Sequence, residues 1–148
     1  MRPRVLLADN HPAVLRAVTA LLKPQFDIVG STTDGASLVS LGLRLCPDVI
    51  VTGITLPVLS GIGAVYRLRE FSLPAKIVFL TIHSEEEFIQ ACMAVGALGY
   101  VLKSQMKAHL IPAIQAALGG QSYICQFIPY DVGVVSGLTL VCRFCRRS

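Results

Sequence analysis

The chain has 148 residues, of which 53% are apolar and 15% are charged, and its formal net charge is +4. That length and apolar share predict one domain with a buried core and exclude a disordered chain. No apolar run approaches the roughly 20 residues of a membrane-spanning helix, and the run near the N-terminus is too short for a secretory signal. We therefore expect a cytoplasmic protein with no membrane partner, and the modest charge gives only weak support to nucleic-acid binding.

Strand-like and helix-like stretches alternate as far as residue 119. In chain order we expect strand 4–9, helix 12–23, strand 27–31, helix 35–46, strand 48–53, helix 61–71, strand 76–81, helix 85–96, strand 98–102 and helix 106–119. Four of the strands are apolar without polar alternation, which is typical of strands buried on both faces of a parallel sheet. The alternation predicts an α/β fold, a doubly wound five-stranded parallel sheet with helices on both faces.

Local signals mark several helix ends. Pro12 suits a first helical turn, where its missing N–H removes no hydrogen bond. Ser84 is the expected N-cap of the fourth helix, with Glu87 at the capping-box position. Gly119 and Gly120 are expected to end the fifth helix.

The last residues follow no helical period. Residues 121–148 could form an extra strand, pack against a partner or be poorly ordered, and the pattern does not decide between these. The five cysteines are odd in number and irregularly spaced, so we expect reduced thiols and no disulfide framework. Cys142 and Cys145 have half of a zinc-ligand spacing without a second pair, so no metal site is expected there.

Polar residues gather where the expected strands end. In a doubly wound sheet the functional crevice lies at the carboxyl ends of the strands. Asp9 and Asn10 follow the first strand, Gly53 ends the third, Thr81 ends the fourth and Lys103 follows the fifth. We expect these residues to form one site.

Motifs at these places resemble one family of signalling domains. They include Val5-Leu6-Leu7-Ala8-Asp9-Asn10-His11-Pro12, Pro47-Asp48-Val49-Ile50-Val51, Leu56-Pro57-x-x-Ser60-Gly61, Leu80-Thr81-x-His83 and Gly96-Ala97-x-Gly99-Tyr100-Val101-Leu102-Lys103. In this order and spacing they resemble the receiver domain of NarL/FixJ (LuxR-type) two-component response regulators, over about residues 3–124. The resemblance implies the flavodoxin-like receiver fold.

The resemblance also implies a role for each residue at the strand ends. Such receivers accept a phosphoryl group on an aspartate after the third strand, with Mg²⁺ held by acidic residues and with a hydroxyl and a lysine on the phosphoryl oxygens. Thr81 matches the hydroxyl position, Lys103 the lysine and Tyr100 the aromatic switch. Asp9 matches the first acid. Two positions depart from the pattern, since Asn10 replaces the second acid and Gly53 replaces the phosphoacceptor aspartate.

These two departures predict a pocket without its usual chemistry. Glycine carries no nucleophile, so phosphorylation on aspartate is not expected. With one carboxylate left, Mg²⁺ binding is expected to be weak or absent, with Asp9 and Asn10 as residual ligands and no other cofactor or metal. Asp9 is instead expected to pair with Lys103. Thr52 should point away from the pocket and Thr55 has no evident base, so a replacement hydroxyl is the less favoured alternative.

Several of these residues could have purely structural roles. Thr81 suits a buried strand end on packing grounds alone, and Tyr100 is favoured as a packing residue over a switch. The three histidines, His11, His83 and His109, are expected to have surface or capping roles.

The sequence therefore predicts a non-enzymatic receiver module at residues 1–124 that signals by protein contacts. Its expected partners are a histidine kinase, another receiver or a second copy. The resemblance to such receivers implies that they dock on the face of the fourth helix, fifth strand and fifth helix, near Tyr100. Residues 125–148 are expected to be an atypical tail without a helix-turn-helix domain. The alternative is the receiver fragment of a DNA-binding transcriptional regulator whose DNA-binding domain is absent from this chain, and a decayed gene is a further possibility.

Overall fold

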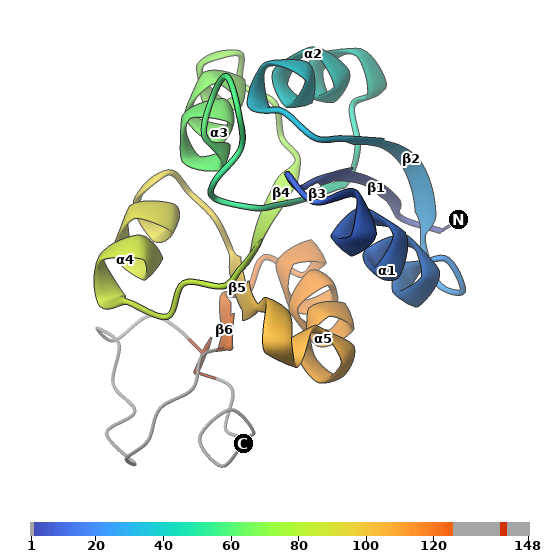
Figure 1. Cartoon of the computed structure of the whole chain (residues 1–148), viewed down its shortest axis with the longest axis vertical. Coiled ribbons are helices and arrows are strands. Elements are labelled where there is room, and N and C mark those ends of the chain that lie inside the picture. The colour runs from blue at the N-terminus through green and yellow to red at the C-terminus, as the bar shows by residue number, and fades with distance from the viewer. Residues whose placement is uncertain (1, 126–139, 142–148) are drawn as a thin grey trace.

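The computed structural model describes residues 2–125 and 140–141 and shows one parallel sheet (Figure 1). Every pair of neighbouring strands is parallel, in the order β2-β1-β3-β4-β5-β6-β7. The strands are β1 (Arg4–Ala8), β2 (Asp27–Thr32), β3 (Val49–Thr52), β4 (Lys76–Thr81), β5 (Gly99–Leu102), β6 (Tyr123–Cys125) and β7 (Leu140–Val141).

Helices cover both faces of the sheet. They are α1 (Pro12–Leu22), α2 (Gly35–Leu45), α3 (Gly61–Glu70), α4 (Glu86–Ala94) and α5 (Met106–Leu118), with a short 3₁₀ turn, η1 (Lys103–Gln105), before α5. One core cluster joins α2, α3 and α4 to the sheet through residues such as Leu38, Leu68 and Ile89. The other joins α1 and α5 to the opposite face through Leu22 and Ile114. The predicted doubly wound α/β fold is confirmed.

Side chains at the helix starts explain where several helices begin. Pro12 occupies the first turn of α1, as predicted. Asp34 accepts a hydrogen bond from the Ser37 N–H at the start of α2, and Ser60 accepts one from Gly63 at the start of α3. The predicted cap of α4 is wrong by one residue, because Glu85 and not Ser84 is the N-cap and makes no side-chain capping bond.

The expected strand count of five is too low, since β6 and β7 extend the sheet beyond β5. Tyr123-Ile124-Cys125 is rich in residues that favour strands, and β5 offers an edge of unpaired backbone groups. The expectation of reduced thiols is wrong for Cys125, which is disulfide-bonded, whereas Cys46 and Cys92 are free. The rest of the tail, including the Cys142-x-x-Cys145 spacing, lies outside the described residues.

The strand order places the expected site at one edge of the sheet. β1 and β3 are neighbours, β4 lies beside β3 and β5 beside β4. Ala8 is level with Thr52, and Thr81 is level with Leu102. The residues that follow β1, β3 and β5 therefore meet Thr81 at the carboxyl ends of the strands. None of the helices among the described residues is long and apolar enough to cross a membrane.

Candidate functional site

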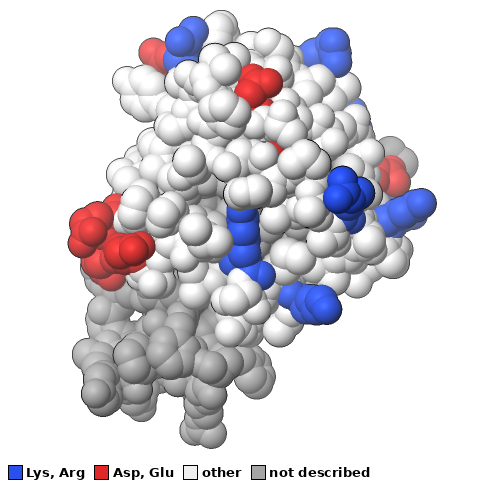
Figure 2. Space-filling model, in the orientation of Figure 1, with Lys and Arg blue, Asp and Glu red and all other residues white. Residues whose placement is uncertain are grey.

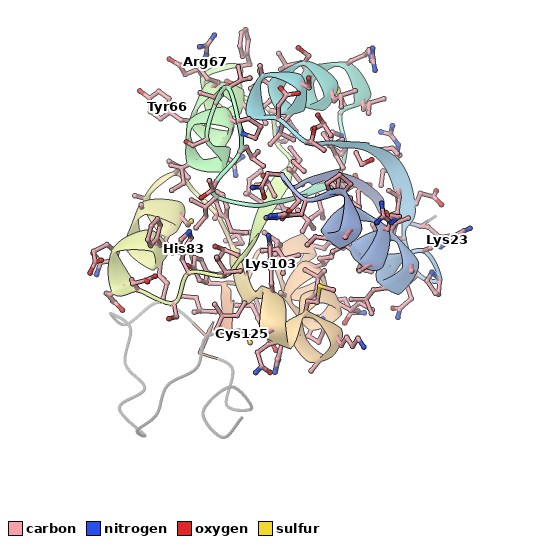
Figure 3. The ribbon with its side chains drawn as sticks, viewed as in Figure 1. Lys23, Tyr66, Arg67, His83, Lys103 and Cys125 are labelled. Atoms are coloured by element: carbon pink, nitrogen blue, oxygen red, sulfur yellow. The ribbon has the colours of Figure 1, made fainter. Side chains whose placement is uncertain are left out.

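A pocket of about 220 Å³ opens at this carboxyl edge. Four of the predicted residues line it, Asn10, Gly53, Thr81 and Lys103, while Asp9 lies beneath it. Lys103 and His83 both lie in this central region of the ribbon (Figure 3). The other lining residues are His11, Ile54, Thr55, Leu80, Ile82 and His83.

Asp9 forms the predicted ion pair with Lys103. The Lys103 Nζ lies 2.8 Å from the Asp9 Oδ2, and the residue Asp9 is only 2% exposed. The other carboxylate oxygen, Oδ1, accepts a hydrogen bond from the His11 backbone N–H at 2.9 Å. The His11 ring approaches the same oxygen, with Nδ1 at 3.5 Å. Both oxygens of Asp9 are therefore engaged by groups of this chain.

The contact on Oδ2 is a charge contact and not a directed hydrogen bond. Oδ2 is buried and has no hydrogen-bond partner of good geometry among the described residues, although the Lys103 ammonium is 2.8 Å away. Pairs as buried as this one are held mainly by the penalty of separating them, because an isolated buried charge is strongly unfavourable. Oδ2 thus faces the space that a side chain at position 53 would fill.

Gly53 leaves that space open without any conformational need for glycine. Its backbone has no left-handed φ, and its N–H donates to the Ala8 carbonyl at 2.9 Å. A Cβ at this position would lie 3.2 Å from the Asp9 Oδ2, a tight contact that a small shift of Asp9 relieves. By contrast, a Cβ on Gly61 would lie 1.8 Å from the Gly53 carbonyl oxygen, so the close approach of α3 requires that glycine.

A second group of contacts fixes the segment after β4. The His83 backbone N–H donates to the Thr81 Oγ1 at 3.1 Å, and the Tyr100 hydroxyl donates to the His83 carbonyl at 2.6 Å. The Tyr100 side chain is fully buried, and this burial raises the pKa of its hydroxyl. Both backbone polar groups of His83 are therefore held by the two residues that sequence analysis matched to hydroxyl and switch positions.

The His83 side chain packs away from these backbone bonds. Its ring stacks on Phe88 of α4 with centroids 4.1 Å apart, and its Nδ1 lies 3.8 Å from Glu85. The expected surface or capping role is confirmed for His11, the exposed N-cap residue of α1, and is wrong for His109, which is buried. The structure also brings His11 and His83 to the pocket wall. The signal was present in the chain, since each histidine follows a strand-end site residue, Asp9 or Thr81, by two positions.

The pocket does not offer the donors that Mg²⁺ prefers. Asp9 is its one carboxylate among the lining and underlying residues, and Lys103 already neutralises that charge. Among the described residues no three histidine, cysteine, aspartate or glutamate side chains come together to hold a metal ion. Mg²⁺ binds through carboxylates and waters, so a single lysine-paired carboxylate is a poor fit.

The alternative hydroxyls lie in different places. The Thr52 side chain is fully buried, does not line the pocket and donates to the Gly53 carbonyl at 2.9 Å. Thr55 is exposed and lines the pocket.

This parallel sheet, with a carboxylate, a hydroxyl and a lysine at its carboxyl edge, defines a receiver-type signalling domain. The sequence matches the response regulator receiver domain over residues 5–115. It is 34% identical over 122 residues to the transcriptional regulatory protein MctR of Rhizobium johnstonii, a match covering 81% of this chain and 57% of that protein. It is 30% identical over 124 residues to the nitrate/nitrite response regulator protein NarL of Escherichia coli, covering 82% and 57%.

A solved structure agrees with these sequence matches. The crystal structure of a LuxR-family two-component response regulator from Aurantimonas is 32% identical, with a TM-score of 0.78 over 82% of this chain and 89% of that one. The chain belongs to the family of response regulator receiver domains, which are signalling modules of two-component systems. It spans less than three fifths of the length of MctR and of NarL.

Proposed function

We propose that residues 1–124 form a receiver module that accepts no phosphoryl group on aspartate and acts by contact with other proteins. The observation that carries this proposal is the geometry at position 53, where glycine faces the Asp9–Lys103 ion pair. In a receiver the nucleophile is a carboxylate in this place, and no other carboxylate lines the pocket. The proposal makes the module non-enzymatic.

Neighbouring side chains are poor replacements for the nucleophile. The Thr52 hydroxyl already donates to a carbonyl in the buried strand end. Thr55 is at the pocket surface, where a hydroxyl needs an adjacent base to become nucleophilic. The pocket carboxylate, Asp9, is held by Lys103 and His11, so it is not free to serve as that base.

The switch residues support signalling from one fixed arrangement. Tyr100 and Thr81 both hold the His83 backbone. Because glycine at position 53 offers no phosphoryl acceptor, the proposal has the surface around this segment act without a phosphoryl signal. That surface includes the exposed Ile82 and the start of α4, over which acidic side chains gather (Figure 2).

The partner would be a histidine kinase or another receiver that docks beside this segment. The expected contact face near Tyr100 needs one change, because the Tyr100 ring is buried and β5 is not an edge strand. The exposed residues after β4 and along α4 are the part of that face which remains open to a partner. The expected boundary at residue 124 also needs a change, because Cys125 is fully buried in the core and β7 pairs with β6 in the same sheet.

The test is restoration of the missing carboxylates. We expect the natural chain to take up no label from a radioactive small-molecule phosphoryl donor with Mg²⁺, Gly53→Asp to take up some, and Gly53→Asp with Asn10→Asp to take up more. Gly53→Ala is the matched control and should take up none. Labelling of the natural chain that Gly53→Ala leaves unchanged would contradict the proposal and favour a replacement nucleophile.

A second candidate is the receiver part of a DNA-binding transcriptional regulator. It is favoured by the match to the transcriptional regulatory protein MctR, of which this chain covers 57%. A reading frame that continues past Ser148 into a helix-turn-helix pattern supports this candidate. A frame that stops there without such a pattern in the following sequence contradicts it.

A further inference from the structure

Strand β6 fills the edge of β5. Gly99, Tyr100 and Val101 of β5 are level with Tyr123, Ile124 and Cys125 of β6 in a parallel pair, beside α4 and α5 in Figure 1. The Tyr123 backbone N–H donates to the Leu98 carbonyl at 2.7 Å. Without β6, this side of β5 would present a row of unpaired backbone groups, which is a template for pairing with another chain.

Side chains hold β6 in place from both faces of the sheet. Ile124 is fully buried in the core cluster of α2, α3 and α4, and Cys125 is fully buried in the cluster of α1 and α5. Figure 3 shows Cys125 beside α5. Because burial of apolar side chains stabilises the folded state, β6 is a packed part of the core.

A polar contact adds a link to α5. The Tyr123 hydroxyl lies 2.9 Å from the Nδ1 of His109, which is 4% exposed. Burial lowers the pKa of His109, so its ring is neutral at neutral pH and keeps one acceptor nitrogen. The short connection from α5 to β6 passes through Gly120, whose φ of +77° suits a tight reversal.

We infer that β6, which is paired with β7 on its other side, is a built-in cap that closes the β5 edge to strand pairing with a second copy of this chain. Strand β6 of the same chain occupies the position beside β5 that a strand of a second copy would otherwise take. A chain whose β5 edge is filled in this way is monomeric through that edge, and displacement of β6 exposes it. The inference does not depend on the chemistry of the pocket, because Tyr123, His109 and Cys125 do not line it.

The test compares two substitutions at Tyr123 in the full chain. Tyr123→Pro removes both the N–H that bonds to Leu98 and the hydroxyl, whereas Tyr123→Phe removes the hydroxyl alone. In sedimentation velocity we expect the natural chain and Tyr123→Phe to sediment alike, with no dimer that shares the β5 edge. Tyr123→Pro should form dimers in a concentration-dependent way. A natural chain that dimerises with its β5 amides protected by the partner, or a folded Tyr123→Pro variant that stays monomeric, overturns the inference.

Hydrogen exchange keeps the inference testable if Tyr123→Pro does not fold. In the monomeric natural chain the amides of Tyr123–Cys125 should exchange as slowly as those of Gly99–Val101. In Tyr123→Phe the amides of β6 should lose at most about tenfold in protection, the equivalent of one hydrogen bond. Exchange of Tyr123–Cys125 at the rate of an unstructured peptide in the natural chain overturns the inference.

Discussion

The Lys103 ammonium lies 2.8 Å from the Asp9 carboxylate, next to Gly53, which has no side chain. In a receiver with an aspartate at this position, the lysine would face an additional carboxylate. Here the remaining acid and the remaining base neutralise each other, and Gly53 places no side chain beside the buried Oδ2. The negative charge of Asp9 is therefore balanced by Lys103 and needs no Mg²⁺ for neutralisation.

Removal of Lys103 should destabilise the fold. Lys103→Met leaves the buried Asp9 carboxylate without its counter-charge, and we expect a loss of about 3 kcal/mol in the free energy of unfolding, since breaking a buried pair on one side is strongly unfavourable. Urea denaturation measures the change. Lys107→Met, at an exposed lysine of α5, is the control and should change stability by less than about 0.5 kcal/mol.

The double variant Asp9→Asn with Lys103→Met, compared with the two single variants, isolates the interaction energy of the Asp9–Lys103 pair. If the ion pair is the reason for the loss, the double variant should be more stable than Lys103→Met alone, with a coupling of about 1–3 kcal/mol. Additive effects of the two substitutions would contradict a direct interaction.

Gly53→Asp should make the fold sensitive to Mg²⁺. The new Cβ would lie 3.2 Å from the Asp9 Oδ2, and the added carboxylate would repel Asp9, so we expect a loss of about 1–2 kcal/mol without metal. Millimolar Mg²⁺ should then raise the Tm of this variant. The Tm of the natural chain and of Gly53→Ala should not respond to Mg²⁺, and an equal rise in all three would count against the reading of the pocket.

Some contacts in the site could be predicted from the sequence, whereas others depend on side-chain conformations that the sequence does not reveal. Asp9 and Lys103 each directly follow a strand of the sheet, but β3 and β4 lie between β1 and β5, so their pairing was expected from the resemblance to receivers and not from strand order. The bond from Tyr100 to the His83 carbonyl could not, because it joins residues 17 positions apart through a side-chain rotamer that the sequence does not set. The sequence shows that residue 53 is glycine, but only the structure shows that its backbone does not adopt a left-handed φ.

The fold, too, was predicted in part and missed in part. The five βα repeats follow from hydrophobic pattern, which is strong in buried parallel strands. Strand β6 has three residues, and its pairing depends on the free edge of β5 and on the burial of Ile124, neither of which a three-residue pattern encodes. The disulfide bond of Cys125 was missed because an odd number of cysteines carries no information on pairing.

Tyr100→Phe should loosen the segment after β4. The substitution leaves the His83 carbonyl without the Tyr100 hydroxyl, and we expect a loss of about 1–2 kcal/mol in unfolding free energy. Amide exchange at residues 82–85 should accelerate more than elsewhere. Tyr66→Phe is the control, because Tyr66 is 58% exposed on α3, and an equal effect of both substitutions would contradict the role given to Tyr100.

Acid should weaken the fold through His109. Burial depresses its pKa in the folded chain below the ordinary 6.5, so the unfolded chain binds a proton first as the pH falls. Its contribution to stability is complete above about pH 6.5 and is lost as the pH falls through the lowered folded value. Urea denaturation across this range measures the slope, and His109→Asn should flatten it. An unchanged slope in that variant would assign the acid sensitivity to other groups.

If glycine at position 53 leaves this receiver without a phosphoryl acceptor, treatment with a phosphoryl donor should leave the intact mass of the natural chain unchanged. The chain is incubated with a small-molecule phosphoryl donor and Mg²⁺, and its mass is recorded beside that of the Gly53→Asp, Asn10→Asp variant treated in parallel. We predict an unchanged mass for the natural chain and an acid-labile phosphoryl adduct on the variant. A phosphoryl adduct on the natural chain would contradict the account.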